Sequence, residues 1–552
     1  MFIRIAKQKR GDKVYRHLQI AESIRDPTKG NAPRTRILAH LGTVEGLGEE
    51  QIEKLIAGLQ RALGREATEP ELLFARDFGH IHAAGGVWDG LGLSEVLDRC
   101  AIAGRSSVEV SALIRLLVVN RLCDPCSKLA LLDWLESVWH DREQPPSYHH
   151  LLRAMDRLIG IKEKAEPLLA KAFLESRESV DLVFYDITST YFEGERSVLE
   201  HDLRAYGYSR DHRRDRRQVV IGMVMTADGI PVCHHVFPGN TADKTTVAAV
   251  VTDLKQRFFL RRVIFVGDRG MLSDANLEHL LGEGVGFIVA HPLRKNGHAT
   301  QVVGTLRAEF DESDEQEQYR EDVRDAVRFV VAYAPQIAAE ARRNRKERLH
   351  KADQWIAEQC RKLTNPSGRG KPATPQGSYD RIRDYLRDRN LLNLYDITLN
   401  AGELSVKKNR KALAWEEAID GVLMLETTDL DLPAAEIVER YKELAEIERG
   451  WRTLKSSLLL RPVYHWTERR IRAHIFICVL ALQLERWMRN RLKSLSVPKA
   501  LQILQQIKVG ELSVNGKRVA MTTRITAEQR EILNQLGVKP IPAQLPTRQA
   551  VV

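Results

Sequence analysis

Two short apolar runs, each carrying an aspartate, constrain the fold of this chain most. VDLVFYDIT contains Asp186 and VIFVGD ends at Asp268. Their near-continuous apolar character predicts buried strands. RQVVIGMVMTADGIPVCHHVFPG reads as further strand, whereas DKTTVAAVVTDLKQRF and NLEHLLGEG have helical spacing. Strands that alternate with helices in this way predict an α/β domain.

Charge and length narrow the class of protein. The chain has 552 residues, with 84 Lys and Arg against 74 Asp and Glu, so its net charge is +10. This excess favours an anionic partner such as nucleic acid. The apolar run Ile475–Leu482 is far shorter than the ~20 residues that span a bilayer, and the N-terminus lacks the apolar region of a signal peptide. We therefore expect a cytoplasmic protein without a membrane segment.

The pattern changes several times along the chain, which predicts several domains. Basic strand-like segments come first, and helical spacing follows them. An acidic run, a basic helix and a Pro/Gly-rich linker then interrupt the α/β pattern. We predict a small basic β-unit at 1–45, a helical DNA-binding or assembly domain at 46–178, an α/β core at 179–294 and 421–494, an inserted mixed subdomain at 295–420, and a weakly patterned tail at 495–552.

Three acidic residues are the candidates for catalysis. Asp186 is predicted to close the strand LVFYD, and Asp268 closes VIFVGD. Sites in open α/β sheets form beyond the carboxyl ends of strands, so these carboxylates can share a metal site. Glu448 lies in a predicted helix, 433–455. Alternatively, each aspartate forms a turn or caps a helix, and Glu448 belongs to a solvated helix face.

Tyr441, Glu448 and Lys455 follow one another at intervals of seven residues. At ~100° per residue each interval returns to within ~20° of the same helix face, which predicts one stripe. A cation, a carboxylate and a phenol on one stripe suit a phosphodiester with its metals. Three carboxylates favour hard ions such as Mg²⁺, and two ions ~3.5–4 Å apart can drive in-line phosphodiester transfer.

Several motifs resemble bacterial insertion-sequence transposases of the DDE class, in the branch with a Tyr-Arg-Glu-Lys signature. They are YDITSTYFEGE, GYSRDHRRDRRQVVIGMV, FPGNTADKTT, VGDRGM, and the Tyr441-x2-Leu-x3-Glu448-x6-Lys455 spacing. The resemblance covers about residues 180–490. It implies an RNase H-like core in which Asp186, Asp268 and Glu448 bind two Mg²⁺ or Mn²⁺.

The resemblance also implies an activity and partners. The enzyme would cleave the terminal inverted repeats of an element and join the freed 3′-hydroxyl ends to target DNA, as a homodimer associated with the bacterial nucleoid. Tyr441 and Lys455 would hold the element end. The signature's Arg position is Leu444, and Arg449 or Arg452 would replace it.

Other basic residues have two interpretations. A cluster follows the first catalytic strand and includes Arg210, Arg213 and Arg214; we favour phosphate contact over a solvated hairpin. Arg461 and His465 follow the catalytic helix and are further candidates for DNA contact. The cluster from Arg342 to Arg348 is as consistent with pairing along a helix as with DNA binding.

Four residues near these motifs have weaker signals. Asp243 is a reserve candidate for metal support, and His234 with His235 is expected to be structural. Trp451 is expected to pack in the core or stack on bases. Two further functions stay open at this point, a metal-dependent nuclease of the same fold and a DNA-binding regulator with a dead catalytic core.

Overall fold

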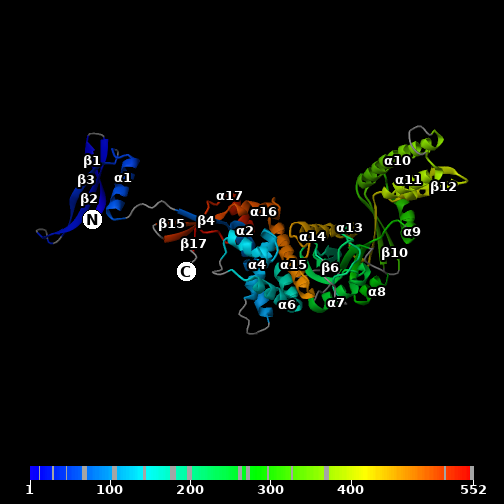
Figure 1. Ribbon diagram of the computed structural model, residues 1–552, viewed down its shortest axis with the longest axis horizontal. Coiled ribbons are helices and arrows are strands. Elements are labelled where there is room, and N and C mark those ends of the chain that lie inside the picture. The colour runs from blue at the N-terminus through cyan, green and yellow to red at the C-terminus, as the bar shows by residue number, and fades with distance from the viewer. Residues whose placement is uncertain are drawn as a thin grey trace. The chain divides into compact units, whose positions relative to one another are not determined.

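A computed structural model describes most of the chain (Figure 1). Its contacts divide the chain into two compact units. The first comprises Met1–Arg76, Lys508–Arg524 and Pro542–Val552, and the second comprises Asp77–Ile507 and Ile525–Ile541. The described residues are 1–10, 13–27, 30, 32–44, 46–64, 71–101, 109–140, 145–174, 182–194, 202–258, 264–268, 274–294, 297–324, 327–365, 372–514 and 517–546.

An eight-stranded mixed sheet forms the centre of the second unit, in the order β10-β11-β14-β9-β8-β5-β6-β7. β5 pairs antiparallel with β6 and parallel with β8, and β8 pairs parallel with β9. The other neighbouring pairs are antiparallel. The strands are β5 (Leu182–Tyr191), β6 (Gln218–Met225), β7 (Pro231–Pro238), β8 (Ile264–Asp268), β9 (Gly286–Ala290), β10 (Gln318–Arg324), β11 (Val327–Tyr333) and β14 (Val422–Thr427).

The apolar runs form the middle of this sheet, as their patterns predict. One face packs on the helices α7 (Val247–Phe258) and α8 (Asp274–Gly282) through a cluster that includes Val183, Val220 and Phe265. The α/β class is thus confirmed. The prediction that Asp186 ends its strand is wrong. β5 continues to Tyr191, and its residues Thr188, Ser189 and Thr190 are buried and paired with β6.

Helices cover the other side of β7. α15 (Glu468–Arg491) packs against α4 (Val110–Cys123), α6 (Tyr148–Leu174) and β7. Almost every residue of α15 from Ala473 to Met488 is buried, so this helix is the centre of the helical layer (Figure 1). The smaller helices of this layer are α2 (Gly79–Gly90), α3 (Leu93–Cys100), α5 (Ala130–Ser137), α16 (Val497–Gln505) and α17 (Ala527–Gln535).

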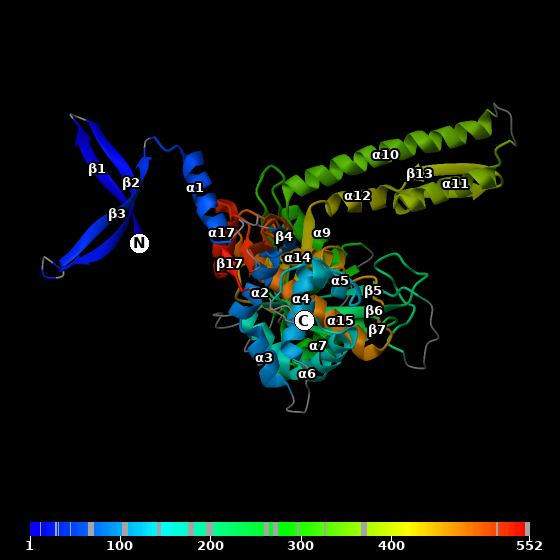
Figure 2. The same cartoon turned by 60° about the vertical axis from the view of Figure 1, so that its left-hand side comes forward.

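The predicted insertion divides into two parts. The first part contains β10 and β11, which extend the central sheet beside β14. It also contains the helix α9 (Gly297–Leu306). The rest has its own apolar cluster around Ile382 and Leu386, and its long helices lie side by side in Figure 2. This part contains α10 (Pro335–Thr364), α11 (Pro375–Asp388), β12 (Tyr395–Asn400), β13 (Glu403–Lys408) and α12 (Arg410–Ala418).

The single helix predicted for 433–455 is two helices, so that prediction is corrected. α13 (Ala434–Lys442) ends before Glu443, and α14 (Leu444–Ser456) begins after it. The segment contains no proline or glycine at the break, so its sequence gives no sign of it. Tyr441 therefore belongs to α13, whereas Glu448 and Lys455 share α14.

The first unit contains strands from both ends of the chain. β1 (Phe2–Arg10), β2 (Lys13–Asp26) and β3 (Ala32–Thr43) form an antiparallel sheet, and α1 (Glu49–Ala62) follows them. A second sheet has the order β17-β16-β15-β4. Its strands are β4 (Glu71–Asp77), β15 (Lys508–Val514), β16 (Lys517–Thr522) and β17 (Gln544–Leu545). The tail is thus more ordered than its weak pattern suggests. Within the described residues, no helix has the combination of length and apolar character that crossing a membrane requires.

Candidate active site

Asp186 and Asp268 lie on adjacent parallel strands. Phe184 of β5 is paired with Val266 of β8, and Asp186 and Asp268 each lie two residues further along their strands. Neighbouring strands lie about 4.8 Å apart, so the backbones of the two aspartates are neighbours. The side chain of Asp268 lies outside the described part of the chain. The two residues thus lie on adjacent strands, and the meeting of their carboxylates stays a prediction.

The carboxylate of Asp186 is held on both oxygens. The indole Nε1 of Trp451 donates to Oδ2 at 3.0 Å, and the backbone N–H of Ile187 donates to Oδ1 at 2.7 Å. Burial raises the pKa of Asp186 to about 6, against the opposite effects of these two donors and of Arg210. The negative charge of Glu448 raises it further. Asp186 is therefore a carboxylate that a nearby cation would stabilise.

Helix α14 brings Glu448 to this carboxylate. Its buried face consists of Ile447, Gly450, Trp451 and Leu454, so the exposed Glu448 lies one turn before the indole that binds Asp186. α14 packs closely on β6 here, since a Cβ at Gly450 would lie 2.7 Å from the Cε at the flexible end of Met225. The bond between Trp451 and Asp186 thus places Glu448 within electrostatic range of Asp186.

Lys455 and Arg461, both predicted to contact DNA, meet at a buried carboxylate. Lys455 Nζ donates to Asp211 Oδ1 at 2.8 Å, and Arg461 forms an ion pair with the same oxygen. The side chain of Asp211 is only 5% exposed. Burial lowers the pKa of Lys455, against the attraction of Asp211. Asp211 is a residue of this region that sequence reasoning missed, and its place inside GYSRDHRRDRR is the only signal for it.

The other predicted DNA contacts lie in different surroundings. Arg449 is exposed and bonds Glu446, and Arg452 is exposed. Tyr441 is half-buried on α13. His465 lies with its ring centroid 5.5 Å from that of His474, and burial lowers its pKa to about 3. A neutral imidazole can still donate to a phosphate oxygen, so His465 as a DNA contact stays a prediction.

The arginines after β5 are divided between pairing and exposure. Arg213 donates to Asp215 at 2.9 Å and lies over the ring of Tyr191, whereas Arg214 is exposed. Arg210 donates to Asp243 at 2.5 Å. Asp243, the reserve candidate for metal support, is thus paired with a guanidinium that also acts on Asp186.

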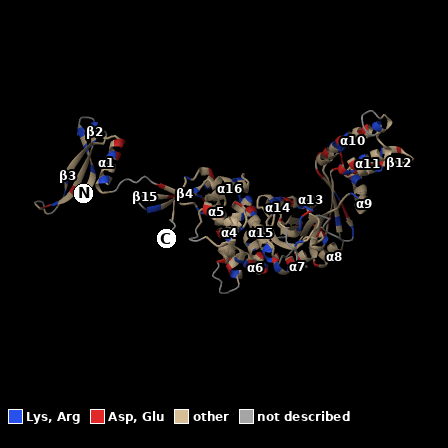
Figure 3. Cartoon of the chain, viewed as in Figure 1, with Lys and Arg blue, Asp and Glu red and all other residues tan. Residues whose placement is uncertain are grey.

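The cluster from Arg342 to Arg348 lies in the inserted subdomain and is paired in part. Arg345 donates to Asp420 at 2.6 Å, and Arg342 lies 3.4 Å from Glu312. In Figure 3, basic and acidic residues alternate along the ribbon of α10 and α11. These contacts favour the interpretation as pairing within the subdomain.

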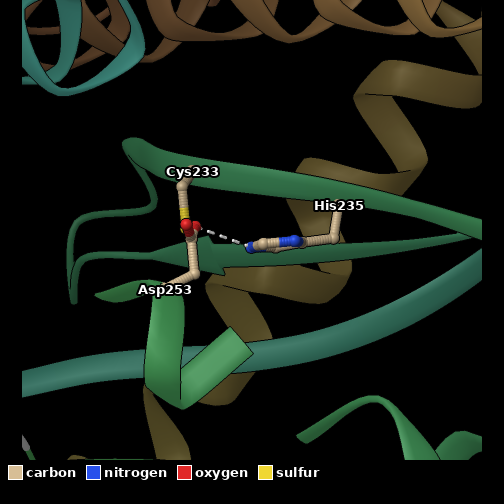
Figure 4. Close-up of side chains that lie close together, drawn as sticks. All are labelled: Cys233, His235 and Asp253. Carbon is tan, nitrogen blue, oxygen red and sulfur yellow. Dashed lines mark ion pairs between the residues drawn. The ribbon is translucent and has the colours of Figure 1, made fainter. Parts of the chain in front are cut away.

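A second group of possible metal ligands lies on the far edge of the sheet. Ligand atoms of Cys233, His235 and Asp253 lie within 4.8 Å of one another (Figure 4). Both carboxylate oxygens of Asp253, however, already accept from Arg257, and burial raises the pKa of the Cys233 thiol well above its usual value. This group is better suited to an ion-pair network, and His234 with its 2.7 Å bond to Glu166 extends the network. The structural role expected for the two histidines agrees with these contacts.

Comparisons with known proteins identify the family of this chain. Residues 182–484 match the family described as "Transposase DDE domain". This match covers more than half of the chain, so the protein belongs to the DDE transposases. Residues 3–71 match "IS1634 family transposase, N-terminal domain", which makes it a transposase of the insertion-sequence type.

Two further comparisons add less. No protein with a curated description matches the chain. Among solved structures, the piggyBac transposase synaptic complex with hairpin DNA, determined by cryo-electron microscopy, is similar over 73% of this chain and 72% of that chain, with 10% sequence identity and a TM-score of 0.37. The predicted recognition is confirmed by the family matches. The protein is a DNA transposase, an enzyme of DNA cleavage and strand transfer in a family that uses divalent metals.

Proposed function

We propose that Asp186, Asp268 and Glu448 are the metal-binding and catalytic residues, and that they bind two Mg²⁺ or Mn²⁺ ions. The observation that carries the proposal is the bond between Trp451 and Asp186, because it fixes α14 over β5 with Glu448 beside Asp186. The carboxylate of Asp268 is assigned because β8 lies beside β5 in the sheet. Oxygen donors alone suit a hard divalent cation.

The sheet order supports an RNase H-like core. The strands β7-β6-β5-β8-β9 follow the order 3-2-1-4-5 along the chain, with the first three antiparallel and the last two parallel to β5. The sequence resemblance implies an RNase H-like sheet flanked by helices, and in this sheet the first acid lies on the first of these strands and the second acid on the fourth.

Each residue near the carboxylates has a separate task. The bound ions would activate the attacking oxygen and stabilise the leaving one. Trp451 and the Ile187 amide orient the Asp186 carboxylate. Asp211 holds Lys455 and Arg461 together beside the site, and Arg210 keeps positive charge near Asp186. Exposed Arg214, Arg449 and Arg452, together with Tyr441, Arg213 and His465, are our remaining candidates for phosphate contacts.

We infer that the substrates are the terminal inverted repeats of an element and a target DNA, and that a homodimer holds two ends at once. Each chain has one set of three carboxylates, which can act on one end of the element. Joining both element ends to the target DNA therefore requires two chains. The protein would act where such DNA lies, at the bacterial nucleoid.

A cleavage and strand-transfer assay on element-end DNA tests the proposal. Asp186→Asn, Asp268→Asn and Glu448→Gln are each expected to lower both steps by at least ~10³-fold, because each removes a metal ligand. Asp98→Asn is the matched control, since Asp98 is an exposed carboxylate on α3. Wild-type activity in any of the three variants would reject the assignment of that residue.

A further inference from the structure

A groove of about 800 Å³ runs along the flank of α14 that faces away from the sheet. Residues of α14, α15 and α16 line it, and the segment Lys493–Ser496 closes one end. Of its lining residues, only Arg449 and Arg452 are among the phosphate contacts proposed above. We name it the Arg486 groove, after the buried guanidinium in its wall.

The groove is strongly basic. Among its described lining residues, five cations face one acid, which is Glu485. A second acid, Glu446, lies behind them and binds Arg449, Arg489 at 2.8 Å and Arg486 at 3.8 Å. Five cations less two acids leave a charge of +3. The cations are Arg449, Arg452, Arg486, Arg489 and Lys493.

Arg486 shows that this charge is incompletely satisfied. Its side chain is 2% exposed, yet Nε and Nη2 have no hydrogen-bond partner. The nearest carboxylate oxygen to Nε belongs to Glu485, at 3.5 Å. A buried guanidinium donor without an acceptor costs about 1–3 kcal/mol or more, and the ion pairs with Glu446 and Glu485 offset only part of this cost. An anion in the groove would add negative charge close to this guanidinium and to the other cations of the lining.

Two features suggest a phosphate group as that anion. Ser496 begins α16 without a side-chain cap bond, and the N-terminus of this nine-residue helix borders the groove, where its amides and dipole favour negative charge. At the rim, Lys493 is exposed, and the half-buried Arg489, which is bound to Glu446, adds a second cation of the kind that follows a phosphodiester backbone. The lining offers few aromatic surfaces for a base.

The groove is continuous with the catalytic face of α14. At ~100° and 1.5 Å per residue, Arg452 lies ~40° round the helix from Glu448 and ~6 Å along it, and Arg449 lies ~100° round. Both arginines line the groove. A DNA strand with its scissile phosphate at Asp186 and Glu448 therefore meets Arg452 first and the groove next.

We propose that the Arg486 groove binds the sugar-phosphate backbone of the DNA that flanks the scissile phosphate, without reading its bases. This inference rests on the proposed catalytic site. It assigns to Arg486, Arg489 and Lys493 the role of holding the flanking strand, which positions that strand for cleavage.

Binding in EDTA tests the groove separately from catalysis. The double variant Arg489→Gln/Lys493→Gln removes two rim cations, and Arg486→Met removes the buried one. The matched control is Arg99→Gln/Lys164→Gln, two exposed cations on α3 and α6. Fluorescence anisotropy would compare three duplexes: an end with flanking DNA, a precut end that stops at the scissile phosphate, and an unrelated duplex.

The rim double variant is expected to weaken binding of the flanked end by roughly 10-fold at 100 mM salt and to lower its salt slope by about 2, as two lost phosphate contacts require. The rim double variant should bind the precut end as tightly as the wild type does. The control variant should bind the flanked end as tightly as the wild type does. Equal loss on all three duplexes, or no loss on the flanked end, would overturn the proposal. A second result would also overturn it. If thymidine 5′-monophosphate raised the melting temperature of the wild type, and Arg486→Met abolished this effect without changing DNA affinity, the ligand of the groove would be a nucleotide. Cleavage by Asp186→Asn would instead reject the catalytic site and leave the groove result standing.

Discussion

Asp186→Asn is expected to make the metal-free protein more stable while it abolishes activity. Burial raises the pKa of this carboxyl from 3.8 to about 6, so the ionised form is disfavoured in the folded chain. Two pKa units at 1.36 kcal/mol each give an upper limit of ~3 kcal/mol at pH 7.5. Asp186 keeps some contact with solvent, which reduces the expected gain to ~1–3 kcal/mol.

The sign of the effect depends on pH. Because the folded pKa is raised, the folded chain holds the proton more tightly than the unfolded one between pH 4 and 6, and stability is lost as pH rises through that window. The advantage of Asp186→Asn should therefore be full at pH 7.5 and roughly half as large at pH 5. The asparagine keeps one oxygen for the Trp451 indole, whereas the Ile187 amide loses its acceptor, which offsets part of the gain.

The assay is thermal unfolding in EDTA and again with Mg²⁺. In EDTA the variant should melt ~2–5 °C above the wild type at pH 7.5. Mg²⁺ should raise the melting temperature of the wild type only, because a ligand stabilises the form that binds it. A variant that melts at or below the wild type at pH 7.5 in EDTA, or that gains as much from Mg²⁺, would refute the reasoning.

Three further predictions follow from single contacts. Trp451→Phe removes the donor to Asp186 and should weaken Mg²⁺ binding by ~10–100-fold, measured by calorimetry, with unchanged affinity contradicting an orienting role. Asp211→Asn leaves Lys455 and Arg461 without their shared carboxylate and should lower the free energy of unfolding by ~2–4 kcal/mol in urea titrations, whereas Asp215→Asn, in an exposed pair, should change it by less than ~1 kcal/mol. Burial lowers the pKa of Lys128 to about 7, so its charge opposes folding below pH 7, and this penalty is relieved as pH rises toward 10.5. Lys128→Met should therefore raise the melting temperature more at pH 7 than at pH 9.5. An equal rise at both pH values would count against a charged Lys128.

Local sequence predicted the core well. The apolar runs around Asp186 and Asp268 are neighbouring strands, and the amphipathic spacing around Glu448 is a helix with Ile447 and Leu454 buried. These features depend on burial of each segment alone, which periodicity records. The predicted end of β5 at Asp186 is wrong, because Thr188 and Ser189 are polar residues that are nevertheless buried in the sheet, where they pair with β6.

Contacts between distant segments could not be predicted. Trp451 is 265 positions from Asp186, and Lys455 is 244 positions from Asp211, so only the fold reveals these partners. The break at Glu443 has no glycine or proline to mark it. The hairpin of β15 and β16 did carry a signal, because Asn515-Gly516 separates two alternating runs, and that signal was missed.

Anomalous scattering from Mn²⁺ in crystals of the protein with element-end DNA is the most direct test of the central claim. The account predicts two peaks ~3.5–4 Å apart, within coordination distance of the carboxylates of Asp186, Asp268 and Glu448. Peaks that lack any one of these three ligands, or that lie instead at Cys233, His235 and Asp253, would contradict it.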